Sequence, residues 1–247
     1  MNSSNPFFKN KNFTNTSKAD VLDNADVMTI SGTINKSLIL LGLLALAFAV
    51  TWYMTFQGYN PMVLTIGGAI SGFVLVLITS FKPEYSRQLA PGYAICEGLF
   101  LGGISAIFEL TSYAGIAMQA VSATMVTFVV CFMLYKYEII KVTEKFKSVV
   151  ISATIAIAAF YIISWLLSMF TSYQPVQYGN SWMSIGISVF VIIIASLNLF
   201  LDFDQIEKGA LNRNPKYMEW FSAMGLIITL VWLYVEFLRL LSKLSRD

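Results

Sequence analysis

Residues 37–56 read SLILLGLLALAFAVTWYMTF, a stretch of twenty residues that contains no charged side chain. A run of this length and apolarity can cross the hydrocarbon core of a bilayer as an α-helix, which takes about 20 residues. Inside lipid the backbone N–H and C=O groups have to be satisfied within the segment, so a helix is the form that such a run adopts. The stretch therefore predicts a transmembrane helix.

Six further apolar runs of similar length follow along the chain. The seven predicted spans are Ser37–Phe56, Met62–Phe81, Tyr93–Leu110, Ile116–Tyr135, Val149–Phe170, Met183–Leu201 and Trp220–Leu241. The connections are short, and five prolines fall in them, namely Pro61, Pro83, Pro91, Pro175 and Pro215. Two Gly-x-x-x-Gly motifs, Gly68–Gly72 and Gly98–Gly102, place small residues on one helix face and so favour close helix packing. We predict an all-α integral membrane protein that forms a bundle of seven transmembrane helices.

The composition supports this class and excludes several others. Of the 247 residues 57% are apolar and only 12% are charged, against about 25% charged residues in a soluble domain. The net charge of +2 is too small to indicate a nucleic-acid partner, so the lipid bilayer is the expected surrounding. Histidine is absent, which removes Ser–His and Cys–His dyads, histidine metal sites and histidine pH switches. Two cysteines within apolar runs, Cys96 and Cys131, do not form a metal or disulfide pattern. We therefore expect no catalytic residue, no metal site, no cofactor and no enzymatic activity.

The N-terminal segment differs from the rest of the chain. Residues 1–33 are rich in Asn, Ser, Thr, Lys and Asp and show little apolar periodicity. Such a segment buries too little apolar surface to offset its conformational entropy, so we predict a disordered tail. The expected organisation is this tail at 1–33 followed by a transmembrane domain at 34–247.

The distribution of Lys and Arg predicts the orientation in the membrane. The tail and the second, fourth and sixth connections carry thirteen of these residues, whereas the first, third and fifth connections carry none. Because cytoplasmic loops are enriched in Lys and Arg, we expect the N-terminus on the cytoplasmic side of the cell (inner) membrane. Three basic residues near the C-terminus, Arg239, Lys243 and Arg246, would lie outside if the seventh run crosses fully, as we expect.

Acidic residues at membrane depth are the candidates for chemistry, because a charge at the centre of a span costs about 2.5 kcal/mol or more. They are Glu97, Glu109, Asp202, Asp204 and Glu236. Glu109 and Asp204 lie near run ends, where they could simply reach interfacial water. Residues two apart on a helix point about 200° away from each other, so Asp202 and Asp204 should face different sides. Glu236 could instead pair locally with Arg239, one turn later.

Several stretches resemble a known family. YAICEGLFLGGIS at 93–105, LNLFLDFDQIEKGA at 197–210 and PKYMEWFSAMGLIITLVWLYVEFLRLL at 215–241 are similar to motifs of the Bax inhibitor-1 (YccA-like, transmembrane BAX inhibitor motif) family, and of its bacterial branch in particular. With YKYEIIKVTEKF at 135–146, the resemblance extends over roughly residues 30–245. It implies a bundle in which the last helix is central.

The resemblance also implies a role for two of the acids. In the family an Asp late in the sixth helix and an Asp in the seventh approach each other as a pH-sensitive pair associated with calcium leak. Asp202 in LDFDQI matches the first, and Glu236 matches the second because LYVEF resembles LYLDF. The chain departs from this pattern in two ways: Glu236 stands where the family has Asp, and the stretch between the two motifs is longer. Two close carboxylates in a low dielectric cannot both ionise easily, so such a pair titrates as a unit.

These observations lead to two functions of different classes. The first is a pH-sensitive cation leak channel or transporter with Ca²⁺ as the expected ion, using Asp202 and Glu236, with Asp204 and Glu97 as further acids of the pathway. Carboxylate oxygens are natural Ca²⁺ ligands, although two residues fall short of the usual six to eight. The second is a non-conducting regulator in a stress response that binds other membrane proteins, such as a quality-control protease.

The predicted topology can be tested by labelling. In a variant without native cysteines, single cysteines placed in the tail and in the 136–147 connection should not react with an impermeant thiol reagent on intact cells. They should react once the membrane is permeabilised, because the Lys/Arg asymmetry puts both segments inside. Strong labelling of intact cells would overturn the topology.

Overall fold

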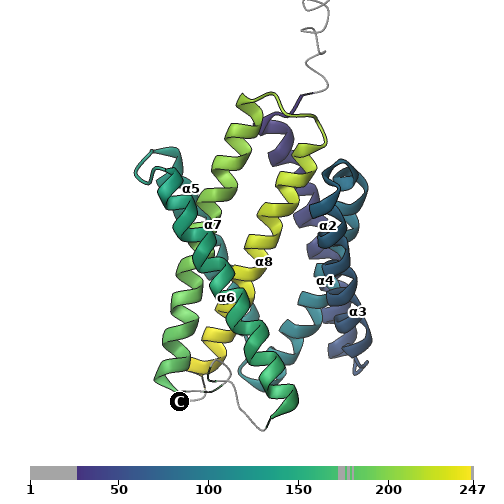
Figure 1. The fold of residues 1–247 in the computed structure, drawn as a ribbon. Helices are drawn as coiled ribbons and strands as arrows, with labels where there is room; N and C mark the ends of the chain where they lie inside the picture. Colours follow the sequence, from purple (N-terminus) through teal and green to yellow (C-terminus); the bar gives the residue numbers. More distant parts are fainter. Residues whose placement is uncertain (1–26, 172–175, 177–178, 180, 246–247) are drawn as a thin grey trace, which may run out of the picture.

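Seven long helices make up the fold in a computed structural model that describes residues 27–171, 176, 179 and 181–245 (Figure 1). They are α2 (Ile30–Phe56), α3 (Met62–Phe81), α4 (Ser86–Thr111), α5 (Ile116–Lys136), α6 (Glu144–Phe170), α7 (Trp182–Leu211) and α8 (Met218–Leu244). A short 3₁₀ turn, η2 (Pro83–Tyr85), leads into α4. Each of the seven is long and apolar enough to cross a membrane. The predicted all-α bundle of seven membrane-spanning helices is confirmed.

The last helix lies at the centre of the bundle. α8 packs against α2 and α4 on one side and against α5 and α7 on the other. In Figure 1 it runs between the α2–α4 group and the α5–α7 group. In its most apolar window 67% of residues are buried, whereas the corresponding share in the other helices is 17–39%. The expected central position of the last helix is therefore confirmed.

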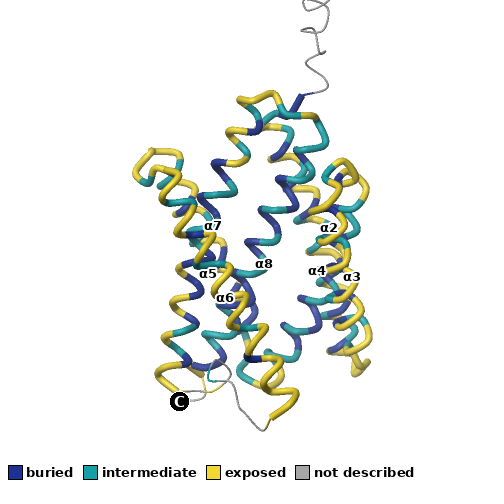
Figure 2. Tube along the Cα trace, in the orientation of Figure 1, coloured by how far each residue is buried: buried dark blue, intermediate teal, exposed yellow. Residues whose placement is uncertain are grey.

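The outer faces of the bundle are apolar and exposed. Figure 2 shows exposed residues along the outer sides of α3 and α6, with buried residues concentrated along α8. On α3, Ile70 and Phe73 are 60% and 62% exposed. Large apolar side chains left uncovered over whole helix faces fit a hydrocarbon solvent rather than water.

The helices extend beyond the predicted spans mainly at one end of the bundle. We call this the basic end, and it comprises the start of α2 and the connections 82–85, 137–143 and 212–217. There α2 begins at Ile30 instead of Ser37, and α7 runs to Leu211 instead of Leu201. Apolarity reports contact with hydrocarbon, but a helix can continue into water when its end is capped, as Thr29 caps α2 by accepting from the Gly32 N–H.

Part of the predicted disordered tail belongs to the fold. Val27 and Met28 are only 8% and 2% exposed. Val27 pairs with Pro215 in an isolated β-bridge, and the Met28 N–H donates to the Asn214 carbonyl at 2.7 Å. The prediction of disorder was thus wrong for residues 27–33, because a two-residue contact is too short to produce apolar periodicity. Residues 1–26 lie outside the described residues.

Pro91 lies within α4 and not in a connection, which corrects a second expectation. The helix begins at Ser86, five residues before the proline. A proline there removes one backbone hydrogen bond. The packing of α4 against both α2 and α3 offsets this loss.

Both Gly-x-x-x-Gly motifs occur where helices touch. A Cβ atom at Gly98 or Gly102 would lie under 3.0 Å from a backbone carbonyl oxygen of α2, that of Leu44 or Phe48. A Cβ atom at Gly68 would meet the Cys96 carbonyl in the same way. The missing side chains therefore let α4 lie directly against its two neighbours.

We predict that Gly98→Ala lowers the free energy of unfolding in detergent by about 1–3 kcal/mol, because the added methyl group overpacks the α2–α4 contact. Gly67→Ala is the matched control, since a Cβ atom there meets nothing within 4 Å and alanine favours the helix. Thermal unfolding followed by circular dichroism would measure both. Equal effects of the two substitutions would contradict the contact.

Candidate functional site

Asp202 lines a cavity of about 190 Å³ between α3, α7 and α8. Its other polar lining residues are Thr79, Ser80, Gln205 and Ser222. One carboxylate oxygen, Oδ2, is buried without a hydrogen-bond partner in the described structure, and the nearby Thr229 hydroxyl donates to the Gly225 carbonyl. Among the described residues that line this cavity none is Lys or Arg. Asp202 is thus an acid at membrane depth with no basic side chain in its cavity.

Glu236 lies in a different environment. It is 1% exposed, and its Oε1 accepts from Arg239 Nη1 at 2.9 Å and from the Tyr161 hydroxyl at 3.3 Å. Its Oε2 has no partner in the described part of the chain. Lys243, one turn beyond Arg239 and 7% exposed, donates to the Ser184 carbonyl at 3.1 Å and to Ser188 Oγ at 2.7 Å. The local pairing of Glu236 with Arg239, one of our two expectations, is present.

The family resemblance implies that Asp202 and Glu236 approach each other, but the described structure contains no hydrogen bond between them. Asp202 lies beside Thr229, which precedes Glu236 by seven residues. At 1.5 Å per residue, this separates the two acids by about 10 Å along α8. The cause is the register of the antiparallel helices α7 and α8, which the Lys243 contacts with Ser184 and Ser188 also define. The longer stretch between the two motifs is the sequence signal of this shift.

Asp204 is fully compensated, in contrast to Asp202. It is 8% exposed, and its Oδ2 lies 2.9 Å from both Lys147 Nζ on α6 and Lys208 Nζ on α7. The two aspartates therefore face different surroundings, as their spacing predicted. Asp204 joins two helices as an ion pair.

Glu97 lies at the interface of α4 with α3. Its Oε2 is buried without a partner in the described residues, and Tyr93, one turn earlier on α4, lies near the carboxylate. A Cβ atom at Gly72 would lie 3.3 Å from Glu97 Oε1, so the glycine makes room for the acid. No hydrogen bond joins Glu97 to Asp202 in the described structure.

Glu109, the remaining candidate, caps the start of the next helix, α5. Its carboxylate accepts from the backbone N–H of Ala117 at 3.2 Å and from that of Gly115. It therefore satisfies free N–H groups at the start of α5.

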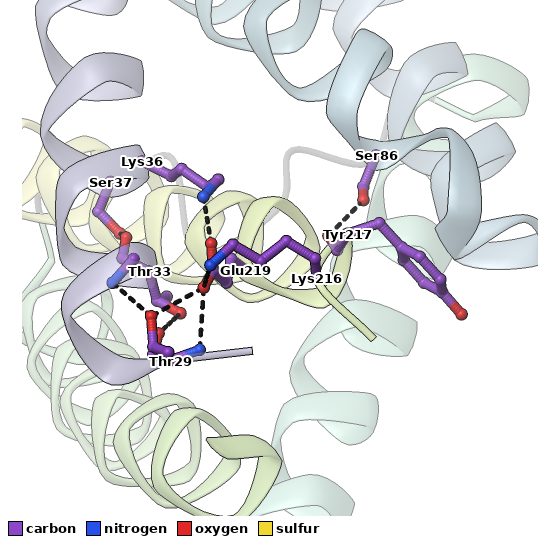
Figure 3. Close-up of polar contacts among 9 residues, drawn as sticks. Thr29, Thr33, Lys36, Ser37, Ser86, Lys216, Tyr217 and Glu219 are labelled. Carbon is purple, nitrogen blue, oxygen red and sulfur yellow. Dashed lines mark hydrogen bonds and ion pairs between the residues drawn. The ribbon is translucent and has the colours of Figure 1, made fainter. Parts of the chain in front are cut away.

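A buried carboxylate at the basic end was missed by sequence reasoning (Figure 3). Glu219 is 0% exposed. Its Oε1 accepts from the backbone N–H and the hydroxyl of Thr29, both at 2.9 Å, and lies 3.0 Å from Lys216 Nζ. Its Oε2 pairs with Lys36 of α2. We call these four residues the clasp, because they join the start of α2 to the start of α8.

Two neighbouring features complete the clasp. A Cβ atom at Gly32 would lie under 3.0 Å from the Glu219 carboxylate, so a larger residue there would have to displace the carboxylate from its present position. Ser86 at the start of α4 donates to the Tyr217 carbonyl at 2.9 Å (Figure 3). Glu219 was overlooked because it flanks an apolar run, where an acid usually reaches water.

We predict that Glu219→Ala lowers the free energy of unfolding by about 3–5 kcal/mol, because it leaves two lysines and the start of α2 without their partner. Glu138→Ala is the control, since its pair with Lys141 is 3.8 Å long and both side chains are exposed, which is worth less than about 1 kcal/mol. Denaturant titration in detergent measures both. A loss for Glu219→Ala as small as that for the control would show that the clasp adds little stability.

Comparison with known proteins places the chain in a family. The model of the Bax inhibitor 1 like family matches residues 5–246, which is nearly the whole chain. A search of curated proteins finds no match.

Proposed function

Because the chain belongs to the Bax inhibitor 1 like family, we propose that it is a pH-sensitive cation leak channel or transporter with Ca²⁺ as the expected ion. The observation that supports this most directly is the buried Asp202 carboxylate, which lies in a cavity lined by no basic side chain among the described residues. A bare carboxylate at this depth is unfavourable, so it has to hold a proton or attract a cation. Exchange between these two states is the proposed source of pH sensitivity.

In this proposal Asp202 and Glu236 act at separate positions along α8. Asp202 offers a free carboxylate oxygen to a passing cation. Glu236 is already paired with Arg239, and Lys243 adds a second positive charge nearby. Two cationic side chains would repel an entering cation, so the Glu236 cluster is the proposed barrier of the path.

A resident metal ion is not part of the proposal. In the described residues no three Asp, Glu or Cys side chains gather closely enough to hold a metal. Water and carbonyl oxygens would complete the coordination of a passing Ca²⁺, which takes six to eight oxygen ligands. A weak site suits conduction, because an ion has to leave as readily as it enters.

For the orientation, we propose a multi-pass protein of the cell (inner) membrane with its N-terminus in the cytoplasm. The thirteen-to-zero distribution of Lys and Arg supports it. The three basic connections and the start of α2 lie at the same end of the bundle (Figure 1). The end of α8 lies at the opposite end, which agrees with full crossing by the last helix.

The central test is cation flux into liposomes that contain only this protein, measured from pH 5 to pH 8. Asp202→Asn should bring the ratio of Ca²⁺ flux between the two pH limits close to one, because its side chain is neutral throughout. Glu236→Gln should lower the flux at every pH, since it leaves the Arg239 charge at the barrier without its partner. Asp204→Asn, on the other face of α7, should keep the wild-type profile, provided that thermal unfolding shows the variant to be folded.

Two results would count against the proposal. A wild-type pH profile in Asp202→Asn would exclude this residue as the sensor. Flux no greater than that of empty liposomes would favour the alternative, a non-conducting regulator that binds other membrane proteins.

A further inference from the structure

A long cleft opens between α2 and α5, on a different side of α8 from the Asp202 cavity. It consists of two adjoining cavities of about 600 and 330 Å³, which share Leu41, Met125 and Leu230 as lining residues. Helices α2 and α5 both pack on α8 but make at most marginal contact with each other in the described structure. The cleft is therefore walled by these two helices and closed at the back by α8.

The length and lining of the cleft match an acyl chain. It follows α2 from Ile30 to Phe48, which is about 27 Å along the helix axis. Its inner part is lined by apolar side chains and by only two hydroxyl-bearing ones, Thr124 and Tyr234. The hydroxyls of both are satisfied, by the Ala120 carbonyl and by Ser105. Apolar spaces of this kind do not hold water, and the solvent at this depth is hydrocarbon.

The depth of the inner part corresponds to one leaflet. Leu38 and Phe48 both line the cleft, and ten residues of helix between them span about 15 Å. One leaflet provides about half of the 30 Å hydrocarbon thickness. A lipid with its head at the basic end would therefore reach Phe48 with its chain.

Charges at the mouth of the cleft favour an anionic headgroup. Lys136 and Lys141 line it, and Lys136 makes no ion pair with any described residue. Three acids also lie at the mouth: Asp204 is held by two lysines, Glu207 accepts from the Tyr135 hydroxyl, and Glu138 makes only a 3.8 Å contact with Lys141. The last pair is exposed on both sides, so Lys141 can turn to a phosphate.

We propose that this cleft binds one anionic phospholipid, with an acyl chain between α2 and α5 and its phosphate at Lys136 and Lys141. The bound chain would fill the gap between the α2–α4 and α5–α7 groups. Lipid would then contact Leu226 and Leu230 of the central helix directly.

The test uses the full-length protein in mild detergent, titrated with phosphatidylglycerol or phosphatidylcholine and analysed by native mass spectrometry. Wild type should retain one phosphatidylglycerol. Ala45→Trp fills the cleft and should weaken retention about 10-fold, which corresponds to displacing about two buried methylenes. Leu46→Trp is the matched control, because Leu46 is 68% exposed, does not line the cleft and should leave retention unchanged.

A second pair of variants approaches the cleft from α5, in case Ala45→Trp does not fold. Val121→Phe should weaken retention like Ala45→Trp, whereas Val126→Phe, which is 64% exposed and outside the cleft lining, should not. For the headgroup, Lys136→Gln with Lys141→Gln should lower affinity for phosphatidylglycerol about 25-fold, or about 1 kcal/mol per charge. Lys82→Gln with Lys145→Gln is the charge-matched control.

Three outcomes would overturn the proposal. The first is retention of phosphatidylglycerol by both cleft-filling variants at the wild-type level. The second is equal retention of phosphatidylcholine and phosphatidylglycerol, which would remove the headgroup assignment. The third is a dimer of the chain that is observed in place of a lipid complex and that the cleft-filling variants no longer form.

Discussion

The position of α8 along its own axis determines which polar and acidic residues of the bundle lie next to one another. Glu219 holds the start of α8 to α2 through Lys36 and Thr29. Near its other end Lys243 is bonded to two serines of α7. Polar contacts at both ends define a single register for α8. This register determines which residues of the neighbouring helices each residue of α8 contacts.

That register separates the intramembrane acids into two kinds. Asp204, Glu219 and Glu236 each have at least one basic partner within the fold. Asp202 and Glu97 have no basic partner among the described residues, and each keeps a buried oxygen without a hydrogen bond there. Paired acids stabilise helix contacts. Of the two acids that lack a basic partner among the described residues, Asp202 is the one to which our proposal assigns the pH response.

Sequence reasoning was reliable where a single helix decides the answer. Met62–Phe81 was predicted and observed with the same bounds, because α3 meets lipid over most of its length and its apolar run ends where the hydrocarbon does. The reasoning was less reliable where residues far apart decide. The burial of Val27 and Met28 depends on a connection nearly 190 residues later, and the distance from Asp202 to Glu236 depends on helix register. Neither leaves a local periodic signal. The clasp was missed for the same reason, since an acid beside an apolar run looks solvated until its distant lysine is known.

The clasp also has a consequence for biosynthesis. Lys36 and Glu219 are 183 residues apart in the chain. At a translation rate of about 5–20 residues per second, roughly 10–40 s pass between the synthesis of the two partners. During that interval α2 carries a lysine without its partner, and Val27 and Met28 lack the connection on which they pack. Closure of this end of the bundle therefore has to wait until α8 has been synthesised.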